Sequence, residues 1–179
     1  MPQNELHIGL LSDTHGHWDE RIAHHLAGCD EIWHAGDIGD FNVIEEIERL
    51  RASKHRIVFG NIDHARIRSE FPEHIEWELN GVHFLMTHIG GRPGRYAKGI
   101  RQLLSDKRPD VFICGHSHLL LVQHDPSWGG LYINPGAVGV HGFHHVRTML
   151  RFSLKDGKIN EMRAIELGDR RKLRSMDKK

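Results

Sequence analysis

Five short apolar runs in this chain each end in polar side chains that can bind a metal ion, and this pattern restricts the fold more than any other feature. The intervals between successive strand ends are 24, 24, 27 and 28 residues, about the length of one strand and its return connection. Ligands of α/β proteins collect outside the carboxyl ends of the strands. We therefore expect these side chains to meet at one edge of a sheet: Asp13, His15, Asp37, Asn61, His88, His116 and His118.

The first third of the chain alternates between strand and helix patterns. Short buried runs predict strands over residues 6–11, 31–35 and 56–59. Between them, apolar residues with helical spacing predict amphipathic helices over residues 18–27 and 41–50. This order is typical of an α/β fold with a parallel sheet.

The remainder of the chain is richer in strands. Residues 75–79 and 82–86 flank Asn80-Gly81, a strong hairpin turn, and a helix is expected over residues 96–104. Further strands are predicted over residues 111–114, 119–123, 131–133, 146–154 and 159–165. We therefore expect an α/β protein in which two sheets pack together with helices outside. All of residues 1–179 form one domain in this interpretation, with a polar tail from residue 167.

Composition narrows the classes of function. The 24 basic and 24 acidic residues balance, which argues against a broad nucleic-acid or anionic-membrane surface. No apolar run has the length of a membrane span, and the N-terminus does not resemble a signal peptide. Cys29 and Cys114 lie in apolar surroundings and are expected to be reduced thiols in or near the core, which fits a cytoplasmic protein.

The candidate ligands form a mixed oxygen and nitrogen set, because they comprise two aspartates, one asparagine and four histidines. Such a set suits manganese, iron or zinc better than calcium, which prefers oxygen alone. Seven ligands are enough for two adjacent divalent ions if one carboxylate is shared, and Asp37 is our candidate for the bridge. An isolated Gly36-Asp37 pair would more often be only a strand-ending turn; the other four strand ends favour the metal site.

These motifs resemble those of the calcineurin-like metallophosphoesterases, whose pattern is D-x-H, GD, GN, a histidine and GH-x-H in this order. The matching segments are Asp13-Thr14-His15, Gly36-Asp37, Gly60-Asn61, His88 and Gly115-His116-Ser117-His118. The short length and Asn134-Pro135-Gly136 resemble the small prokaryotic phosphodiesterase branch. The resemblance implies a four-layer αββα fold, in which a two-sheet β-sandwich is flanked by helices, and a dinuclear site that often holds manganese.

The resemblance also implies a role for each ligand. Asp13, His15 and His118 would hold one ion, Asn61, His88 and His116 would hold the other, and Asp37 would bridge them. Of these, Asp37, His88 and His116 are expected to be the catalytic residues. Manganese is the expected metal, with iron, zinc, nickel or magnesium as alternatives.

The implied reaction is hydrolysis of a small phosphate ester, preferably a phosphodiester, by a hydroxide that the two ions share. We expect no membrane partner and leave self-association open. The alternative function is a non-catalytic protein-binding scaffold on the same fold, as in the eukaryotic retromer subunit of this family. The intact set of seven ligand types favours the enzyme, since a scaffold would be free to lose them.

One position departs from the family pattern. Many active members carry a histidine directly after the asparagine of the GN motif, where it can protonate the leaving group, but this chain has Ile62. The small prokaryotic branch shares this departure. We therefore expect weaker activity or a preference for leaving groups that depart without a proton. His64 could act as a substitute, although a solvated loop histidine is the simpler interpretation.

Four polar residues near the motifs allow two interpretations each. His34 could brace the metal site or be a core histidine bonded to backbone. His17 could line the cleft or lie beside a helix N-cap, which we favour. Arg92 and Arg95 could hold a phosphate or belong to a solvated loop.

The last third of the chain contains two further basic features. His141, His144 and His145 could border the cleft, but most of them are expected at the surface. Residues 172–179 are basic, and we interpret them as a solvated tail.

Overall fold

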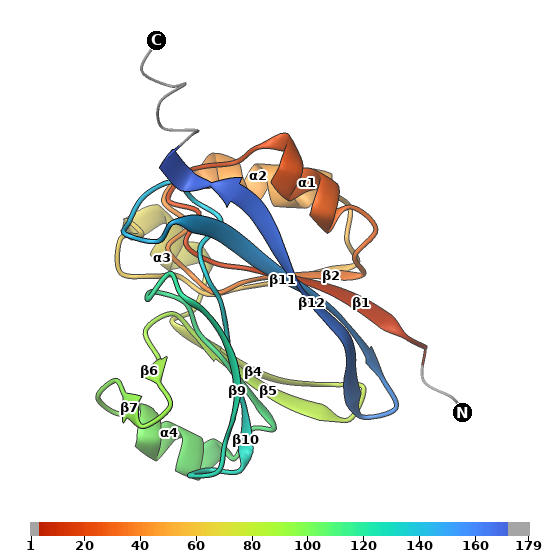
Figure 1. Ribbon diagram of the computed structural model, residues 1–179, viewed down its shortest axis with the longest axis vertical. Coiled ribbons are helices and arrows are strands. Elements are labelled where there is room, and N and C mark those ends of the chain that lie inside the picture. Colours follow the sequence, from red (N-terminus) through yellow and green to blue (C-terminus); the bar gives the residue numbers. More distant parts are fainter. Residues whose placement is uncertain (1–3, 172–179) are drawn as a thin grey trace.

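The protein, represented by a computed structural model whose residues 4–171 are described here, is built from two sheets packed face to face with helices on their outer faces (Figure 1). The first sheet has the strand order β12-β11-β1-β2-β3 and the second β4-β5-β8-β10-β9. Helices α1 and α2 cover the outer face of the first sheet, and α4 covers that of the second. The expected αββα sandwich is therefore confirmed.

The first sheet combines the N-terminal α/β unit with the last hairpin of the chain. Its parallel strands are β1 (Leu6–Leu11), β2 (Glu31–His34) and β3 (Lys54–Ile57), linked by α1 (Glu20–Leu26) and α2 (Phe41–Arg49). Asp19 and Asp40 cap the two helices, because their carboxylates accept hydrogen bonds from backbone N–H groups of the first turns. The long antiparallel hairpin of β11 (Val146–Lys155) and β12 (Lys158–Asp169) completes the sheet beside β1.

The second sheet contains the predicted hairpin at its edge. Its strands are β4 (His74–Leu79), β5 (Val82–Thr87), β8 (Val111–Ile113), β9 (Leu120–Asp125) and β10 (Gly130–Pro135). Strand β8 runs parallel to both β5 and β10. The remaining elements are α3 (Ala65–Glu70), α4 (Ile100–Lys107) and a small hairpin of β6 (Gly91–Arg92) and β7 (Arg95–Tyr96).

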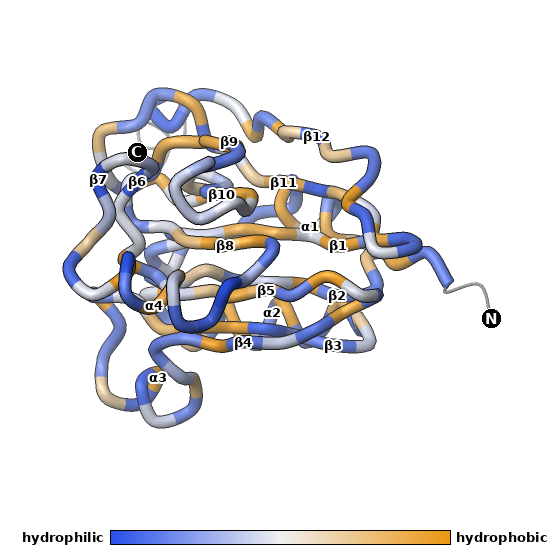
Figure 2. Tube along the Cα trace, turned by 90° about the horizontal axis from the view of Figure 1, so that it is seen from below, coloured by the Kyte–Doolittle hydropathy of each residue, from blue (hydrophilic) through white to orange (hydrophobic). Residues whose placement is uncertain are grey.

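Apolar side chains fill the space between the layers, and Figure 2 shows hydrophobic residues concentrated along the central strands. Trp33 is buried between the sheets, where its ring makes edge contacts with Trp77, Phe84 and Phe152. Two further apolar layers join the helices to the outer faces of the sheets. Cys29 and Cys114 are buried and free, as predicted.

The structure corrects three expectations. The expected helix over residues 96–104 begins only at Ile100, because Gly99 precedes it in a left-handed conformation with φ of +85°. Helix α3 was not expected. The polar tail was expected from residue 167, but β12 continues to Asp169 and Leu167 is only 1% exposed. Its side chain packs in the apolar layer between α1, α2 and the first sheet. Residues 172–179 lie outside the described part of the chain.

None of the helices in residues 4–171 combines the length and the hydrophobicity that crossing a membrane requires.

Candidate metal centre

The predicted strand ends meet at one edge of the sandwich, where the two sheets face each other. Asp13 follows β1, and its backbone N–H donates to the carbonyl of Gly36, which follows β2, at 3.0 Å. In the other sheet, Gly115 after β8 donates to the carbonyl of His88 after β5, also at 3.0 Å. The two pairs are joined across the sandwich, since the N–H of His116 donates to Oδ2 of Asp13 at 3.1 Å.

A first cluster combines two carboxylates and two imidazoles from Asp13, His15, Asp37 and His118, whose ligand atoms lie within 4.8 Å of one another. Nε2 of His118 lies 3.1 Å from Oδ1 of Asp13, and Nε2 of His15 lies 3.5 Å from Oδ2 of Asp37. The two Nε2 atoms are 3.3 Å apart. Four possible ligand atoms therefore converge on one small volume.

A second cluster shares Asp37 with the first and adds His88 and His116. Nε2 of His88 lies 3.1 Å from Oδ1 of Asp37, whose other oxygen faces His15. Asn61 is placed beside this cluster, because the next residue, Ile62, donates its backbone N–H to Oδ1 of Asp37 at 3.0 Å. The structure thus brings six of the seven predicted ligands together in the two clusters and places Asn61 on the wall of a cavity that His88 also lines; Asn61 and His116 are exposed.

The buried atoms of these clusters fit a cation. Oδ1 of Asp13 and Nε2 of His88 are buried without a hydrogen-bond partner among the described residues, which is costly unless another group binds them. Nδ1 of His88 faces the carbonyl oxygen of Ala35 at 2.8 Å. A carbonyl only accepts, so Nδ1 carries the hydrogen, and in the neutral ring Nε2 presents a lone pair to the carboxylates. Divalent metals bind such lone pairs and carboxylate oxygens together.

The electrostatics of the second cluster also favour a bound cation. Burial opposes a positive charge on His88, but the carboxylates of Asp37 and Asp13 outweigh it and raise the pKa of that imidazole. Burial likewise opposes a negative charge on Asp37, but the contact with His88 outweighs it and lowers the pKa of the carboxyl group. The two aspartates therefore create a negative site that stabilises positive charge.

The backbone of the ligands is strained. Five of the seven, which are Asp13, His15, Asp37, His116 and His118, have left-handed φ values between 49° and 67°. This conformation is uncommon for residues other than glycine, and it persists at functional sites where the surrounding structure enforces it. The glycines of the motifs have a steric role: a Cβ atom at Gly60 would lie 2.1 Å from Oδ1 of Asp37, and one at Gly115 would lie 2.8 Å from Oδ2 of Asp13.

His34 is both a core histidine bonded to backbone and a brace for the metal site, the two interpretations that the sequence left open. It is fully buried, and its Nδ1 accepts the backbone N–H of Gly36 at 3.1 Å. Its Nε2 lies 2.9 Å from Oγ1 of Thr14, between two ligands of the first cluster. Burial lowers the pKa of His34 to about 4, so the ring is neutral and Nε2 is the donor. His34 therefore connects the loops after β1 and β2 that carry Asp13 and Asp37.

The loop before β11 places His144 beside the first cluster, although most histidines of this loop were expected at the surface. His144 is only 6% exposed, and its Nδ1 lies 3.2 Å from Nδ1 of His118. His141 and His145 are exposed, as expected for most of this group, but the ring of His141 lies 5.7 Å from that of His15. A high density of histidines just after Asn134-Pro135-Gly136 was the available signal for a site neighbour.

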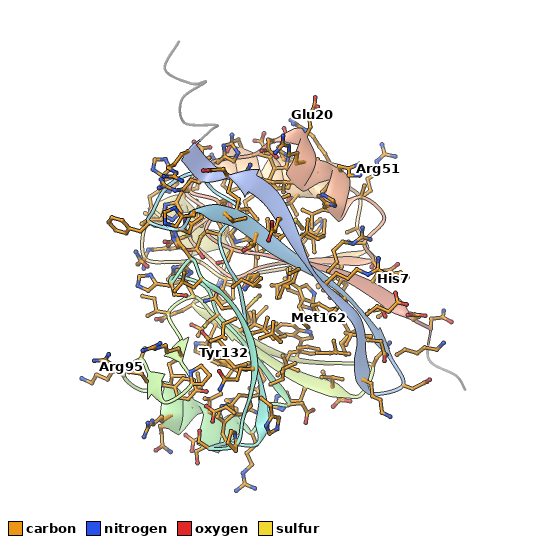
Figure 3. The ribbon with its side chains drawn as sticks, in the orientation of Figure 1. His7, Glu20, Arg51, Arg95, Tyr132 and Met162 are labelled. Carbon is orange, nitrogen blue, oxygen red and sulfur yellow. The ribbon has the colours of Figure 1, made fainter. Side chains whose placement is uncertain are left out.

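The remaining candidates lie outside the clusters. His17 contacts the capping carboxylate of Asp19 at 3.2 Å, as the favoured interpretation proposed. His64 precedes α3 and is exposed. Arg92 and Arg95 are exposed on the small hairpin, and Arg95 points away from the protein (Figure 3).

Two cavities flank the clusters. One of about 570 Å³ adjoins Asn61 and His88, and its lining includes the cationic side chains of Arg68 and Lys98 together with the acidic Glu73. The other, of about 590 Å³, adjoins His116 and His118 and is more apolar, with Leu119 and Phe143 on its wall. A substrate bound at the clusters could extend in two directions.

Solved structures of known proteins share the fold of this chain. A solved archaeal phosphodiesterase is 26% identical to this chain, with a TM-score of 0.70 and coverage of 90% of this chain and 100% of its own. A predicted phosphoesterase from Streptococcus pneumoniae is 17% identical, with a TM-score of 0.61 and coverage of 92% and 99%. Vps29 from Entamoeba histolytica complexed with Zn²⁺ is 14% identical, with a TM-score of 0.65 and coverage of 90% and 99%.

A search of curated proteins finds no match. The family model of the calcineurin-like phosphoesterase superfamily domain matches residues 6–157, which is most of the chain. The matched range contains all seven candidate ligands and every strand except β12. The chain therefore belongs to the calcineurin-like phosphoesterase superfamily.

Proposed function

We propose that this protein is a phosphoesterase that uses two divalent metal ions, preferably manganese, and hydrolyses small phosphodiesters. The observation that carries the proposal is the position of Asp37, whose two carboxylate oxygens face different histidines in two adjoining ligand clusters. One carboxylate with an oxygen directed to each side is what two neighbouring cations need as a bridge. The 26% identical archaeal phosphodiesterase supports the choice of diesters.

The ligands would divide between the two ions as the motifs imply. Asp13, His15 and His118 would hold one ion, with Asp37 shared. Asn61, His88 and His116 would hold the other. Two cations at such a site lower the pKa of a water from about 15.7 towards about 7 and neutralise charge on phosphate oxygens.

Backbone groups of the chain orient these ligands before substrate binds. The carbonyl of Ala35 holds His88 in the tautomer that leaves Nε2 free, and the N–H groups of Ile62 and His116 fix one oxygen of each aspartate. Preorganised groups of this kind need no rearrangement as charge develops on the phosphate. Ile62 is 44% exposed beside the second cluster and cannot donate a proton to the leaving oxygen.

The scaffold function remains the second candidate because one observation favours it. Phe143 is 99% exposed and Leu119 is 63% exposed on the wall of the apolar cavity, and clustered exposed apolar residues can mark a protein-binding surface. A vacuolar protein sorting 29 structure from Cryptosporidium parvum has the same fold, with a TM-score of 0.66 and 18% identity. The ligand clusters favour the enzyme, since protein binding does not require them.

Metal reconstitution tests the proposal. The protein is stripped with chelator, and manganese, iron, zinc, nickel or magnesium is added back before hydrolysis of bis(p-nitrophenyl) phosphate and p-nitrophenyl phosphate is measured. We expect activity that depends on metal, is highest with manganese and is higher on the diester. Two ions per chain are expected by elemental analysis. Saturation with fewer than two ions, or the absence of hydrolysis with every metal, would refute the two-metal phosphoesterase.

A further inference from the structure

A chain of hydrogen bonds leads from the ligand His118 away from the metal site to a backbone carbonyl. Nδ1 of His118 faces Nδ1 of His144 at 3.2 Å, and Nε2 of His144 faces the carbonyl oxygen of Gly139 at 3.1 Å. The carbonyl can only accept, so Nε2 of His144 carries a hydrogen. With His144 neutral, its Nδ1 accepts, and the donor between the two rings is then Nδ1–H of His118.

This order of donors determines which nitrogen of His118 can bind a metal. If Nδ1 of the neutral ring carries the hydrogen, Nε2 has the free lone pair. Nε2 is also the atom that lies 3.1 Å from Oδ1 of Asp13, inside the first cluster. We propose that His144 is a positioning residue that holds His118 in the Nδ1–H tautomer and aims its Nε2 at the metal of the first cluster. The proposal deepens the proposed function and rests on it for the metal.

The position of His144 supports its role as an acceptor for His118. Its side chain is buried, and its two ring nitrogens face the carbonyl oxygen of Gly139 and Nδ1 of His118. The loop backbone also approaches His118 closely, because a Cβ atom at Gly142 would lie 2.3 Å from Nδ1 of His118. Any side chain at position 142 would therefore displace one partner of the hydrogen bond.

The C-terminal end of the described chain holds this loop in place. The side chain of Arg170 donates to the carbonyl of His144 at 2.7 Å and to that of Val140 at 3.3 Å. Its backbone N–H donates to the carbonyl of His145 at 3.0 Å. Arg170 thus supports the loop on both sides of Gly142, three residues beyond the point where the sequence analysis expected a tail to begin.

The second cluster achieves the same result more directly. His88 is held in its Nδ1–H tautomer by the carbonyl of Ala35 at 2.8 Å, without an intervening side chain. In the first cluster His144 transmits the constraint from Gly139 to His118. Partners that fix the tautomer of a histidine ligand typically change metal affinity by about 10- to 100-fold when they are mutated.

The first experiment measures metal affinity in the full chain by calorimetric titration of stripped protein with Zn²⁺ and Mn²⁺. His144→Phe removes the acceptor while keeping a ring, and we expect about 10- to 100-fold weaker binding of one of the two ions. His144→Asn can place an amide oxygen near the former Nδ1 and should recover much of the loss. His145→Phe, at an exposed neighbour, is the matched control and should bind both ions like the wild type. Equal affinities for His144→Phe and His145→Phe would overturn the proposal.

The second experiment observes the tautomer itself by ¹⁵N NMR of the imidazole rings of the wild type. With Zn²⁺ bound, His118 should keep a protected Nδ1 hydrogen and coordinate through Nε2. Should no zinc bind, the proposed function fails, but the tautomer can still be read in metal-free protein above pH 8. An Nε2–H tautomer there, or coordination through Nδ1, would overturn the role of His144 whatever the activity. This measurement remains valid if His144→Phe does not fold.

Arg170 offers a weaker form of the same test. Arg170→Ala should reduce the affinity for the same ion as His144→Phe, by a smaller factor, and should speed exchange of the Nδ1 hydrogen of His118. Arg171→Ala, next to it on the exposed side, is the control and should change neither. An effect of Arg170→Ala on the other ion alone would contradict the proposed support.

Discussion

The two ligand clusters share Asp37 but differ in how far the protein has organised them. In the first cluster, Asp13 is fully buried, His15 and His118 are half-buried, and His118 is held by His144. In the second, His88 is buried and held by a carbonyl, but the side chains of Asn61 and His116 are exposed and make no hydrogen bond within the described residues. The first cluster is preformed, whereas the second is preformed on one side only.

This difference implies that the two clusters bind a metal ion with different affinity. A metal at the first cluster would meet four candidate ligand groups that already lie close together. A metal at the second cluster must also order two exposed side chains, which costs conformational entropy. We therefore expect the first ion to bind more tightly than the second. The open side of the second cluster adjoins the cavity with Arg68 and Lys98, where a phosphate ester can approach.

The largest effect is expected from substitution of Asp37, the residue that the two clusters share. Asp37→Asn keeps the shape of the side chain but removes the charge that holds two cations together. We expect loss of at least one ion and a fall in hydrolysis of more than about 100-fold, since even indirect partners of ligands account for 10- to 100-fold. Elemental analysis and kcat/KM check this, with circular dichroism to verify the fold. Retained activity at two ions per chain would show that Asp37 is not the bridge.

The next prediction concerns the buried connection of His34 to the first cluster. Its pKa is about 4 in the folded protein and about 6.5 in the unfolded chain, so below pH 6.5 the unfolded state takes up a proton that the folded state does not. The free energy of unfolding should therefore fall between pH 6.5 and 4, by up to about 3 kcal/mol. Above pH 6.5 this contribution is fully present.

Urea unfolding of chelated protein across this pH range measures the effect. His34→Gln should be less stable than the wild type at pH 8, because it alters the bonds to Thr14 and Gly36. Its stability should, however, decline less steeply on acidification. Parallel pH curves for the two proteins would mean that His34 is not the group responsible.

A smaller effect is expected at Ile62, which lies on the exposed side of the second cluster and cannot act as a general acid. Without a proton donor at Ile62, kcat/KM should fall steeply as the leaving-group pKa rises across aryl and alkyl phosphodiesters. Ile62→His should raise activity on poor leaving groups by at least about tenfold, short of the 10²–10⁴-fold of an oriented acid. A flat dependence in the wild type, with chemistry rate-limiting, would indicate another donor such as His64, and His64→Ala would then identify it.

The smallest effect is expected from substitution of Asn61, and it tests whether the two clusters bind their ions independently. Asn61→Ala should weaken the second binding event by up to about tenfold and leave the first unchanged, because Asn61 is exposed and is proposed to hold only the second ion. Calorimetric titration with manganese separates the two events. His64→Ala, at an exposed neighbour before α3, serves as the control for titration. Equal weakening of both events would show that the clusters are not independently organised.

Much of this protein follows from local patterns in its sequence. The spacing of apolar residues predicts the alternation of β1, α1, β2 and α2, and the turn residues predict the hairpin at Asn80-Gly81. Both signals extend over only a few positions of the sequence. The seven candidate ligands could be proposed because each stands at or just after the end of an apolar run. Strand ends of an α/β protein gather at one edge.

Interactions between distant residues could not be found in this way. The extent of β12 depended on the packing of Leu167 against elements of the first sheet and its helices. His144 looked like one of several surface histidines. Its role depends on a contact with a residue 26 positions away and on a carbonyl that turns towards it.

Spacing and side-chain chemistry are local properties, and they were enough to predict most of the elements and the seven candidate ligands from the sequence. Only the tertiary structure decided which nitrogen of each histidine faces the metal site and which ligands are supported. That choice depends on hydrogen bonds whose direction is set by where a distant carbonyl or ring comes to lie, as at Ala35 for His88 and at His144 for His118. Periodicity carries no information about such contacts, since they form only when the two sheets and the C-terminal hairpin have packed together.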